Sequence, residues 1–210
     1  MASLLPPLSR IGKVVAVTSC KGGVGKSTVS FEVARLLASR GHRVAYYDAD
    51  IHGPSLPALV PADVSARGVE PAADGWAMEP LDYENVAMMS FGWLGRLWSA
   101  GDGAVIDARG AGGDGALAVQ LLHTTRWGDR DFLIIDTPPG TGDVPRALAA
   151  RGALHGAVVV TTPSKLATVD VLRGVSMLRD FGVGVLGVVE NMASFRCDGC
   201  EKDHFPFGSG

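Results

Sequence analysis

Short apolar runs alternate along the chain with segments in which apolar residues recur every three or four positions. The runs predict buried strands at 14–18, 43–47, 85–90, 132–135, 157–160 and 183–189. The periodic segments predict helices at 27–39, 116–127, 144–151 and 168–181. Strands that alternate with helices form right-handed βαβ units. We therefore expect an α/β fold with a mostly parallel, doubly wound sheet.

Two stretches do not fit this alternation. Residues 56–85 contain four prolines, and we interpret them as an irregular surface excursion with a short hairpin near Trp76 and Met78. Residues 91–115 are rich in glycine and give no assignable element. No domain boundary is evident after the first ten residues. We expect an N-terminal extension at 1–10 and one domain across 11–210.

A glycine-rich loop joins the first predicted strand to the first predicted helix. Backbone N–H groups at such a loop and helix N-terminus form a cradle for anions. Lys26 adds a charge for phosphate, and the Ser27 hydroxyl can bind Mg²⁺. The expected nucleotide-binding residues are Gly22, Gly23, Val24, Gly25, Lys26, Ser27 and Thr28. Cys20 replaces the first glycine of the usual pattern, and Lys21 supplies the second lysine of the deviant Walker A form. The loop therefore predicts binding of a nucleoside triphosphate.

Carboxylates follow two other predicted strands. Asp136 ends one of them, as in the Walker B arrangement that orients Mg²⁺. Asp48 and Asp50 end another at alternate positions, and we expect both to face the same side if the strand continues. We assign Asp50 to the attacking water and Asp48 to the Mg²⁺ shell. Gly140 follows two prolines, and we expect its N–H to face the γ-phosphate in a switch loop.

Cys197 and Cys200 form a Cys-x-x-Cys pair beyond the last predicted strand. Two thiolates supply half of a tetrahedral metal or cluster site. A two-fold dimer would supply the other half, or His204 would be a third ligand in a zinc knuckle. A redox disulfide and an incidental pair are the remaining alternatives.

Composition limits the function classes further. The 210 residues are 47% hydrophobic with a net charge of −3, which argues against a nucleic-acid-binding surface. No segment has the length of a membrane span, and the first ten residues are not a convincing secretory signal. Three cysteines suit a reducing compartment. We expect a soluble protein of the cytoplasm or, after removal of a transit peptide, of the plastid stroma or mitochondrial matrix.

Taken together, these motifs resemble the Mrp/NBP35-type P-loop ATPases, which are carriers and scaffolds of iron–sulfur clusters. The likeness rests on the glycine-rich loop, 48–55, 136–143, 161–163 and 190–192 followed by Cys-x-x-Cys. Cys20 and the segment 205–208 are similar to the plastid branch.

The resemblance implies an ATPase that hydrolyses ATP slowly to ADP and phosphate as a homodimer. In such a dimer Lys21 reaches the partner's phosphates and Asn191 contacts adenine. The resemblance also implies a [4Fe-4S] cluster bridged by Cys197 and Cys200 of both subunits and delivered to apoproteins.

The sequence departs from this family at three places. Residues 108–111 replace a Trp-Arg-Gly-Pro segment, and Glu32 stands where asparagine is common. Family members continue beyond the cysteines with a further strand and helix, which we expect this domain to lack.

Two other functions share the glycine-rich loop. One is an ATP-switched positioning protein of the MinD/ParA kind, and the other is a nucleotide-binding protein with a structural zinc.

Overall fold

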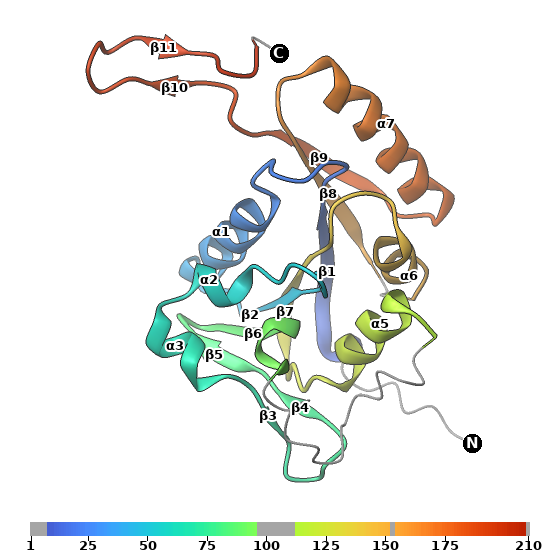
Figure 1. Ribbon diagram of the computed structural model, residues 1–210. Helices are drawn as coiled ribbons and strands as arrows, with labels where there is room; N and C mark the ends of the chain where they lie inside the picture. The colour runs from blue at the N-terminus through green and yellow to red at the C-terminus, as the bar shows by residue number, and fades with distance from the viewer. Residues whose placement is uncertain (1–7, 96–111, 152–153, 209–210) are drawn as a thin grey trace.

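A computed structural model describes residues 8–95, 112–151 and 154–208 of the chain (Figure 1). Residues 1–7 and the sequence departure at 108–111 lie outside this described part. A short 3₁₀ turn at Leu8–Arg10 precedes the first strand, which begins at Ile11. A second 3₁₀ turn, Phe91–Trp93, lies at the start of the stretch that the sequence left unassigned.

A seven-stranded sheet forms the centre of the fold, in the order β5-β6-β2-β7-β1-β8-β9. Every neighbouring pair is parallel except β5 with β6. The mostly parallel sheet expected from the sequence is therefore confirmed. The strands are β1 (Ile11–Thr18), β2 (Val44–Asp48), β5 (Leu81–Tyr83), β6 (Val86–Ser90), β7 (Arg130–Asp136), β8 (Gly156–Thr161) and β9 (Val185–Glu190).

Helices cover both faces of the sheet, as a doubly wound fold requires (Figure 1). Helix α1 (Lys26–Ser39) lies on one face. Helices α5 (Asp114–Thr124), α6 (Asp143–Arg151) and α7 (Lys165–Asp180) lie on the other. The central strands are buried on both sides, which explains why they read as continuous apolar runs rather than as alternating patterns.

The prediction of an irregular excursion at 56–85 is wrong in part. Two short helices occur there, α2 (Leu56–Leu59) and α3 (Ala62–Arg67). Pro57 lies in the first turn of α2 and Pro61 is the N-cap residue of α3. Proline is tolerated at helix starts because the N–H it lacks has no partner within the helix. Two of the four prolines that suggested irregular structure, Pro57 and Pro61, therefore mark where helices begin.

Two hairpins complete this region. The expected hairpin is present as β3 (Glu70–Pro71) paired with β4 (Met78–Glu79). A second hairpin joins β5 to β6 through Glu84 and Asn85, which both have positive φ angles. Two consecutive positive φ angles give the turn a twist that suits a two-residue hairpin loop. The sequence analysis missed β5 because the turn lacks glycine.

The chain leaves the sheet after β9, which is the edge strand and exposes most of its side chains. It then forms a hairpin of β10 (Phe195–Arg196) and β11 (Asp203–His204). Figure 1 shows this hairpin extending away from the body of the fold, above α1. Within the part of the chain that the structure describes, no helix is long and apolar enough to cross a membrane.

Candidate functional site

The carboxyl ends of β1, β2 and β7 meet at one edge of the sheet and surround a pocket of about 270 Å³. The loop between β1 and α1, called the P-loop below, forms most of the pocket wall. The lining residues are Ser19, Lys21, Gly22, Gly23, Gly25, Lys26, Ser27, Thr28, Asp50, Ser55 and Pro139. Of the expected nucleotide-binding and catalytic residues, Val24, Asp48, Asp136, Gly140 and Asn191 do not line it. A loop of backbone N–H groups with two lysines suits a phosphate chain.

Two glycines of the P-loop have positive φ angles, 77° at Gly23 and 80° at Gly25. Gly25 is also crowded, because a Cβ atom there would lie 2.4 Å from the side-chain nitrogen of Asn191. That nitrogen donates a hydrogen bond of 2.8 Å to the Val24 carbonyl. Asn191 thus braces the P-loop from the end of β9, with its amide nitrogen engaged by protein.

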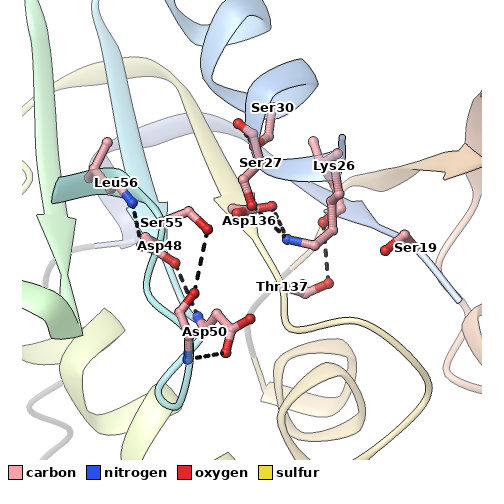
Figure 2. A network of polar contacts seen from close by, with 12 residues as sticks. Ser19, Lys26, Ser27, Ser30, Asp48, Asp50, Ser55, Leu56, Asp136 and Thr137 are labelled. Atoms are coloured by element: carbon pink, nitrogen blue, oxygen red, sulfur yellow. Dashed lines mark hydrogen bonds and ion pairs between the residues drawn. The ribbon is translucent and has the colours of Figure 1, made fainter. Parts of the chain in front are cut away.

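A buried ion pair lies behind the pocket, where the Lys26 amine is 2.5 Å from Oδ1 of Asp136 (Figure 2). Asp136 is fully buried, and Lys26 is 7% exposed. The same amine donates to the Ser27 hydroxyl at 3.2 Å. Oδ2 of Asp136 is a buried oxygen without a hydrogen-bond partner among the described residues. An unpaired carboxylate oxygen beside a serine hydroxyl fits a hard divalent cation such as Mg²⁺.

Asp48 and Asp50 do not share a side as the sequence analysis expected, because β2 ends at Asp48. Asp50 lies in the following turn and lines the pocket. Asp48 is fully buried and accepts hydrogen bonds from the Ser90 hydroxyl and the Leu56 N–H. It therefore anchors the loop after β2 to β6 and α2, away from the pocket.

The environment of Asp48 raises its pKa from the usual 3.8 to about 6. Burial is the main cause, because it disfavours the charged carboxylate. Donation from the Leu56 N–H opposes this effect, and the nearby Asp136 adds to it.

The Gly140 N–H is not directed at the pocket in this structure. It donates a hydrogen bond of 2.7 Å to the Ser19 carbonyl. The neighbouring Pro139 lines the pocket instead. Contact between Gly140 and a γ-phosphate would require this bond to break.

Cys20 packs outward against helix α7, which explains why a residue other than glycine fits there. A Cβ atom on Gly174 would lie 2.4 Å from the Cys20 sulfur, so a small residue is needed opposite. Partial burial raises the pKa of the Cys20 thiol. Lys21, next in the chain, is exposed at the pocket mouth.

The second cluster of candidate residues lies on the β10–β11 hairpin. The donor atoms of Cys197, Cys200 and His204 all lie within 4.8 Å of one another. The Cys200 sulfur is 3.4 Å from Nε2 of His204. Backbone N–H groups of Cys200 and Gly199 approach the Cys197 sulfur and lower the pKa of that thiol. The arrangement suits thiolate coordination of a metal.

Three pocket residues were not singled out from the sequence: Ser19, Ser55 and Pro139. Each lies next to a motif that was recognised, in the loops after β1, β2 and β7. Loops at the carboxyl ends of parallel strands form ligand sites in α/β sheets, and this rule is the signal that could have found them.

A family model described as the NUBPL iron-transfer P-loop NTPase matches residues 10–210. The chain belongs to this family. Membership agrees with the P-loop and with the resemblance to iron–sulfur cluster carriers inferred from the sequence.

Relatives of this NUBPL-type chain carry names from iron–sulfur cluster assembly. The chloroplastic Fe-S cluster assembly factor HCF101 of Arabidopsis thaliana is 46% identical over 203 residues, which cover 97% of this chain and 36% of that protein. The iron-sulfur cluster carrier protein of Escherichia coli K12 is 40% identical over 205 residues, which cover 98% of this chain and 53% of that protein. The chain thus spans between a third and about half of the length of these two relatives.

Solved structures show the same architecture. A nucleotide-binding protein from Archaeoglobus fulgidus, in complex with ADP and with cobalt found in it, aligns with a TM-score of 0.78 at 35% identity. The alignment covers 99% of this chain and 77% of that one. The cell division ATPase MinD of Pyrococcus furiosus aligns with a TM-score of 0.59 at 22% identity over 89% of this chain and 74% of that one, which shows a shared fold.

Substitution of Gly25 by alanine should destabilise the protein, whereas alanine at Gly22 should not. Gly25 has a positive φ, and a Cβ atom added there would clash with the Asn191 side chain. A Cβ atom added at Gly22 would meet no neighbouring atom within 4 Å. The left-handed conformation alone costs about 1–2 kcal/mol for a residue with a Cβ atom. Thermal unfolding without nucleotide compares Gly25→Ala with Gly22→Ala. Equal midpoints for the two variants would contradict this account of the loop.

Asp48 should make stability fall as pH rises from about 4 to 6. The native state holds a proton on this carboxyl up to about pH 6, whereas the unfolded state releases it near 3.8. The native state then binds more protons in that window, and its free energy of unfolding drops by roughly 3 kcal/mol across it.

Urea unfolding of wild type and Asp48→Asn, measured from pH 4 to pH 7 with chelator, checks this dependence. Wild type should lose stability relative to the variant as pH rises. Ser90→Ala removes one donor to the carboxylate and should move the transition to higher pH. If the free energies of unfolding of wild type and Asp48→Asn change with pH in parallel, the Asp48 carboxyl is not the source of the pH dependence.

Proposed function

We propose that this chain binds and slowly hydrolyses ATP as a homodimer, carries a [4Fe-4S] cluster between its two subunits, and delivers the cluster to apoproteins. The observation that carries the proposal is the presence of two sites on one fold. The P-loop pocket has the backbone and lysine groups that suit phosphates, and a pair of thiols, half-buried Cys197 and exposed Cys200, can hold a cluster. The names of the relatives support iron–sulfur cluster transfer as the shared task.

The pocket supplies the groups that phosphoryl transfer needs. Lys26 pairs with Asp136 in the structure and turns to the phosphates when nucleotide binds. Asp50 lines the pocket and orients the attacking water by accepting its hydrogen bond. Release of the Gly140 N–H from Ser19 makes it available to the γ-phosphate, so the 137–142 loop acts as a switch.

The residues present fit a Mg²⁺ ion at the Ser27 hydroxyl and the unpaired Oδ2 of Asp136. When bound there, Mg²⁺ would neutralise charge on the β- and γ-phosphates. We do not place Asp48 in this shell, because its oxygens accept hydrogen bonds from Ser90 and Leu56.

Lys21 is exposed at the pocket mouth, in a position to serve a facing subunit. In our proposal it crosses the dimer interface and stabilises the charge that develops on the partner's phosphates. Asn191 contacts the adenine through its side-chain oxygen, while its side-chain nitrogen stays bonded to the Val24 carbonyl.

The cluster is cargo held by the β10–β11 hairpin. Cys197 and Cys200 from each subunit give four thiolates, the number that a [4Fe-4S] cluster takes. The hairpin extends from the body of the fold, so an apoprotein can approach the cluster directly (Figure 1). The thiols must stay reduced to bind it. We therefore expect the protein to work in a reducing compartment, such as cytoplasm, plastid stroma or mitochondrial matrix.

Mixing two inactive variants should restore ATP hydrolysis if Lys21 acts across the dimer. Lys21→Ala and Asp50→Ala each disable both sites of their own homodimer. A mixed dimer has one site that lacks both groups and one complete site, so a 1:1 mixture should recover about a quarter of wild-type activity. Phosphate release measures the recovery.

Lys13→Ala, another exposed lysine, is the matched control and should hydrolyse ATP like wild type. A mixture as inactive as its components would mean that Lys21 acts within its own subunit. Binding of ATP to each variant, measured separately, shows whether the loss lies in binding or in hydrolysis.

Removal of the cysteine pair should abolish cluster binding. Anaerobic reconstitution of wild type should give about two iron and two sulfide per subunit, with the broad visible absorption of thiolate-bound clusters. Cys197→Ala/Cys200→Ala should hold neither, and Cys20→Ser should match wild type because that thiol packs against α7. Equal iron and sulfide in the double variant would refute the carrier proposal.

A further inference from the structure

The β10–β11 hairpin contains a third potential ligand, His204, that a cluster shared by two cysteine pairs does not use. The three donor atoms lie within 4.8 Å of one another in one subunit, and no other group of three or more such side chains was found in the described part of the chain. We propose that Cys197, Cys200 and His204 bind one zinc-type divalent cation within a single subunit, with the fourth tetrahedral position open.

The distances already approach those of a tetrahedral site. Zinc–sulfur bonds of about 2.3 Å and zinc–nitrogen bonds of about 2.0–2.1 Å place adjacent sulfur and nitrogen ligands about 3.6 Å apart. The Cys200 sulfur and Nε2 of His204 are 3.4 Å apart. Small rotations of exposed side chains suffice to place a cation between the three donor atoms.

The backbone of the hairpin brings these ligands together. The Cys197 N–H donates to the Lys202 carbonyl, and the Glu201 N–H donates back to the Cys197 carbonyl at 2.7 Å. These bonds fold 197–202 into a tight turn that places both cysteines at the end of the hairpin. Glu201 has a φ of 55°, a left-handed conformation that closes the turn.

His204 is held in place by its partner across the hairpin. Phe195 pairs with His204 in the ladder, and their rings are stacked with centroids 5.2 Å apart and an interplanar angle of 18°. Stacking fixes the plane of the imidazole while Nε2 faces Cys200. A ligand whose orientation is fixed before the metal arrives loses less entropy on binding.

The surroundings favour a cation. Asp198 and Glu201 are exposed acidic residues of the turn, and Asp203 is an exposed acidic residue of β11. Two exposed basic residues, Lys202 in the turn and Arg196 opposite Asp203 in the ladder, leave one excess negative charge. The excess negative charge attracts a divalent ion. Thiolate and imidazole are the ligand types that zinc prefers over the hard oxygen ligands of Mg²⁺.

This site differs from a shared cluster in a way that can be measured. A cation held by three ligands of one subunit binds once per subunit, and its affinity does not depend on protein concentration. An ion shared by four cysteines of a dimer binds once per two subunits and makes no use of His204. The inference does not depend on ATP hydrolysis or on cluster transfer.

Titration of the metal-free, reduced protein with Co²⁺ tests the proposal, because Co²⁺ is a coloured substitute for Zn²⁺. We expect one Co²⁺ per subunit, thiolate-to-metal charge-transfer absorption, and displacement by Zn²⁺. His204→Phe keeps a flat ring against Phe195 but removes the nitrogen, and it should weaken Co²⁺ binding at least about 10-fold. His42→Phe, an exposed histidine outside the hairpin, is the control and should bind like wild type.

Two outcomes would overturn the inference: one Co²⁺ per two subunits with concentration-dependent affinity, or unchanged affinity in His204→Phe. Circular dichroism of each variant verifies that the body of the fold is intact. Iron and sulfide uptake after reconstitution is measured separately. A His204→Phe protein that loses Co²⁺ binding but still takes up a cluster would support the single-subunit site and leave the carrier function intact. If the wild-type protein takes up no iron and sulfide, the carrier function is refuted, but the single-subunit cation site is not.

Discussion

The buried ion pair between Lys26 and Asp136 is the interaction on which the nucleotide pocket depends. Asp136 has no exposure to water, so its charge needs a cation at all times. Lys26 supplies that charge in the structure, at 2.5 Å. Removal of one partner from a buried pair costs about 3–5 kcal/mol, because the other charge is left uncompensated. The P-loop, β1 and β7 are therefore fixed relative to one another before any ligand arrives.

The parallel register of the sheet places the other groups around this pair. Asp48 of β2 lies directly beside Asp136 of β7, and Val17 of β1 lies on its other side. Two neighbouring carboxyls in a dry environment repel each other when both are charged. The chain resolves this conflict by giving Asp136 a lysine and Asp48 a set of hydrogen-bond donors. Asp136 thus pairs with the P-loop lysine, whereas Asp48, directly beside it, anchors the loop that follows β2.

Most of the sheet and the P-loop could be predicted from the sequence, because apolar runs and the glycine-lysine pattern are local signals. The short helices α2 and α3 could not, since prolines near helix starts look like breakers without the surrounding structure. The different positions of Asp48 and Asp50 depend on where β2 ends, which is decided by contacts with Ser90 and Leu56. The engagement of the Gly140 N–H by Ser19 depends on contact between two loops that are distant in sequence.

The hydrogen bond between Asn191 and the P-loop sets the reach of the β10–β11 hairpin. Asn191 is tied to Val24, and five residues separate it from Cys197. An extended chain of that length spans at most about 20 Å. The hairpin is therefore a short tether with one end attached beside the nucleotide pocket. Two such tethers can meet at one metal centre only if their pockets lie within about 40 Å of each other. Any assembly that shares a metal centre between two hairpins must therefore hold the two nucleotide pockets within that distance of each other.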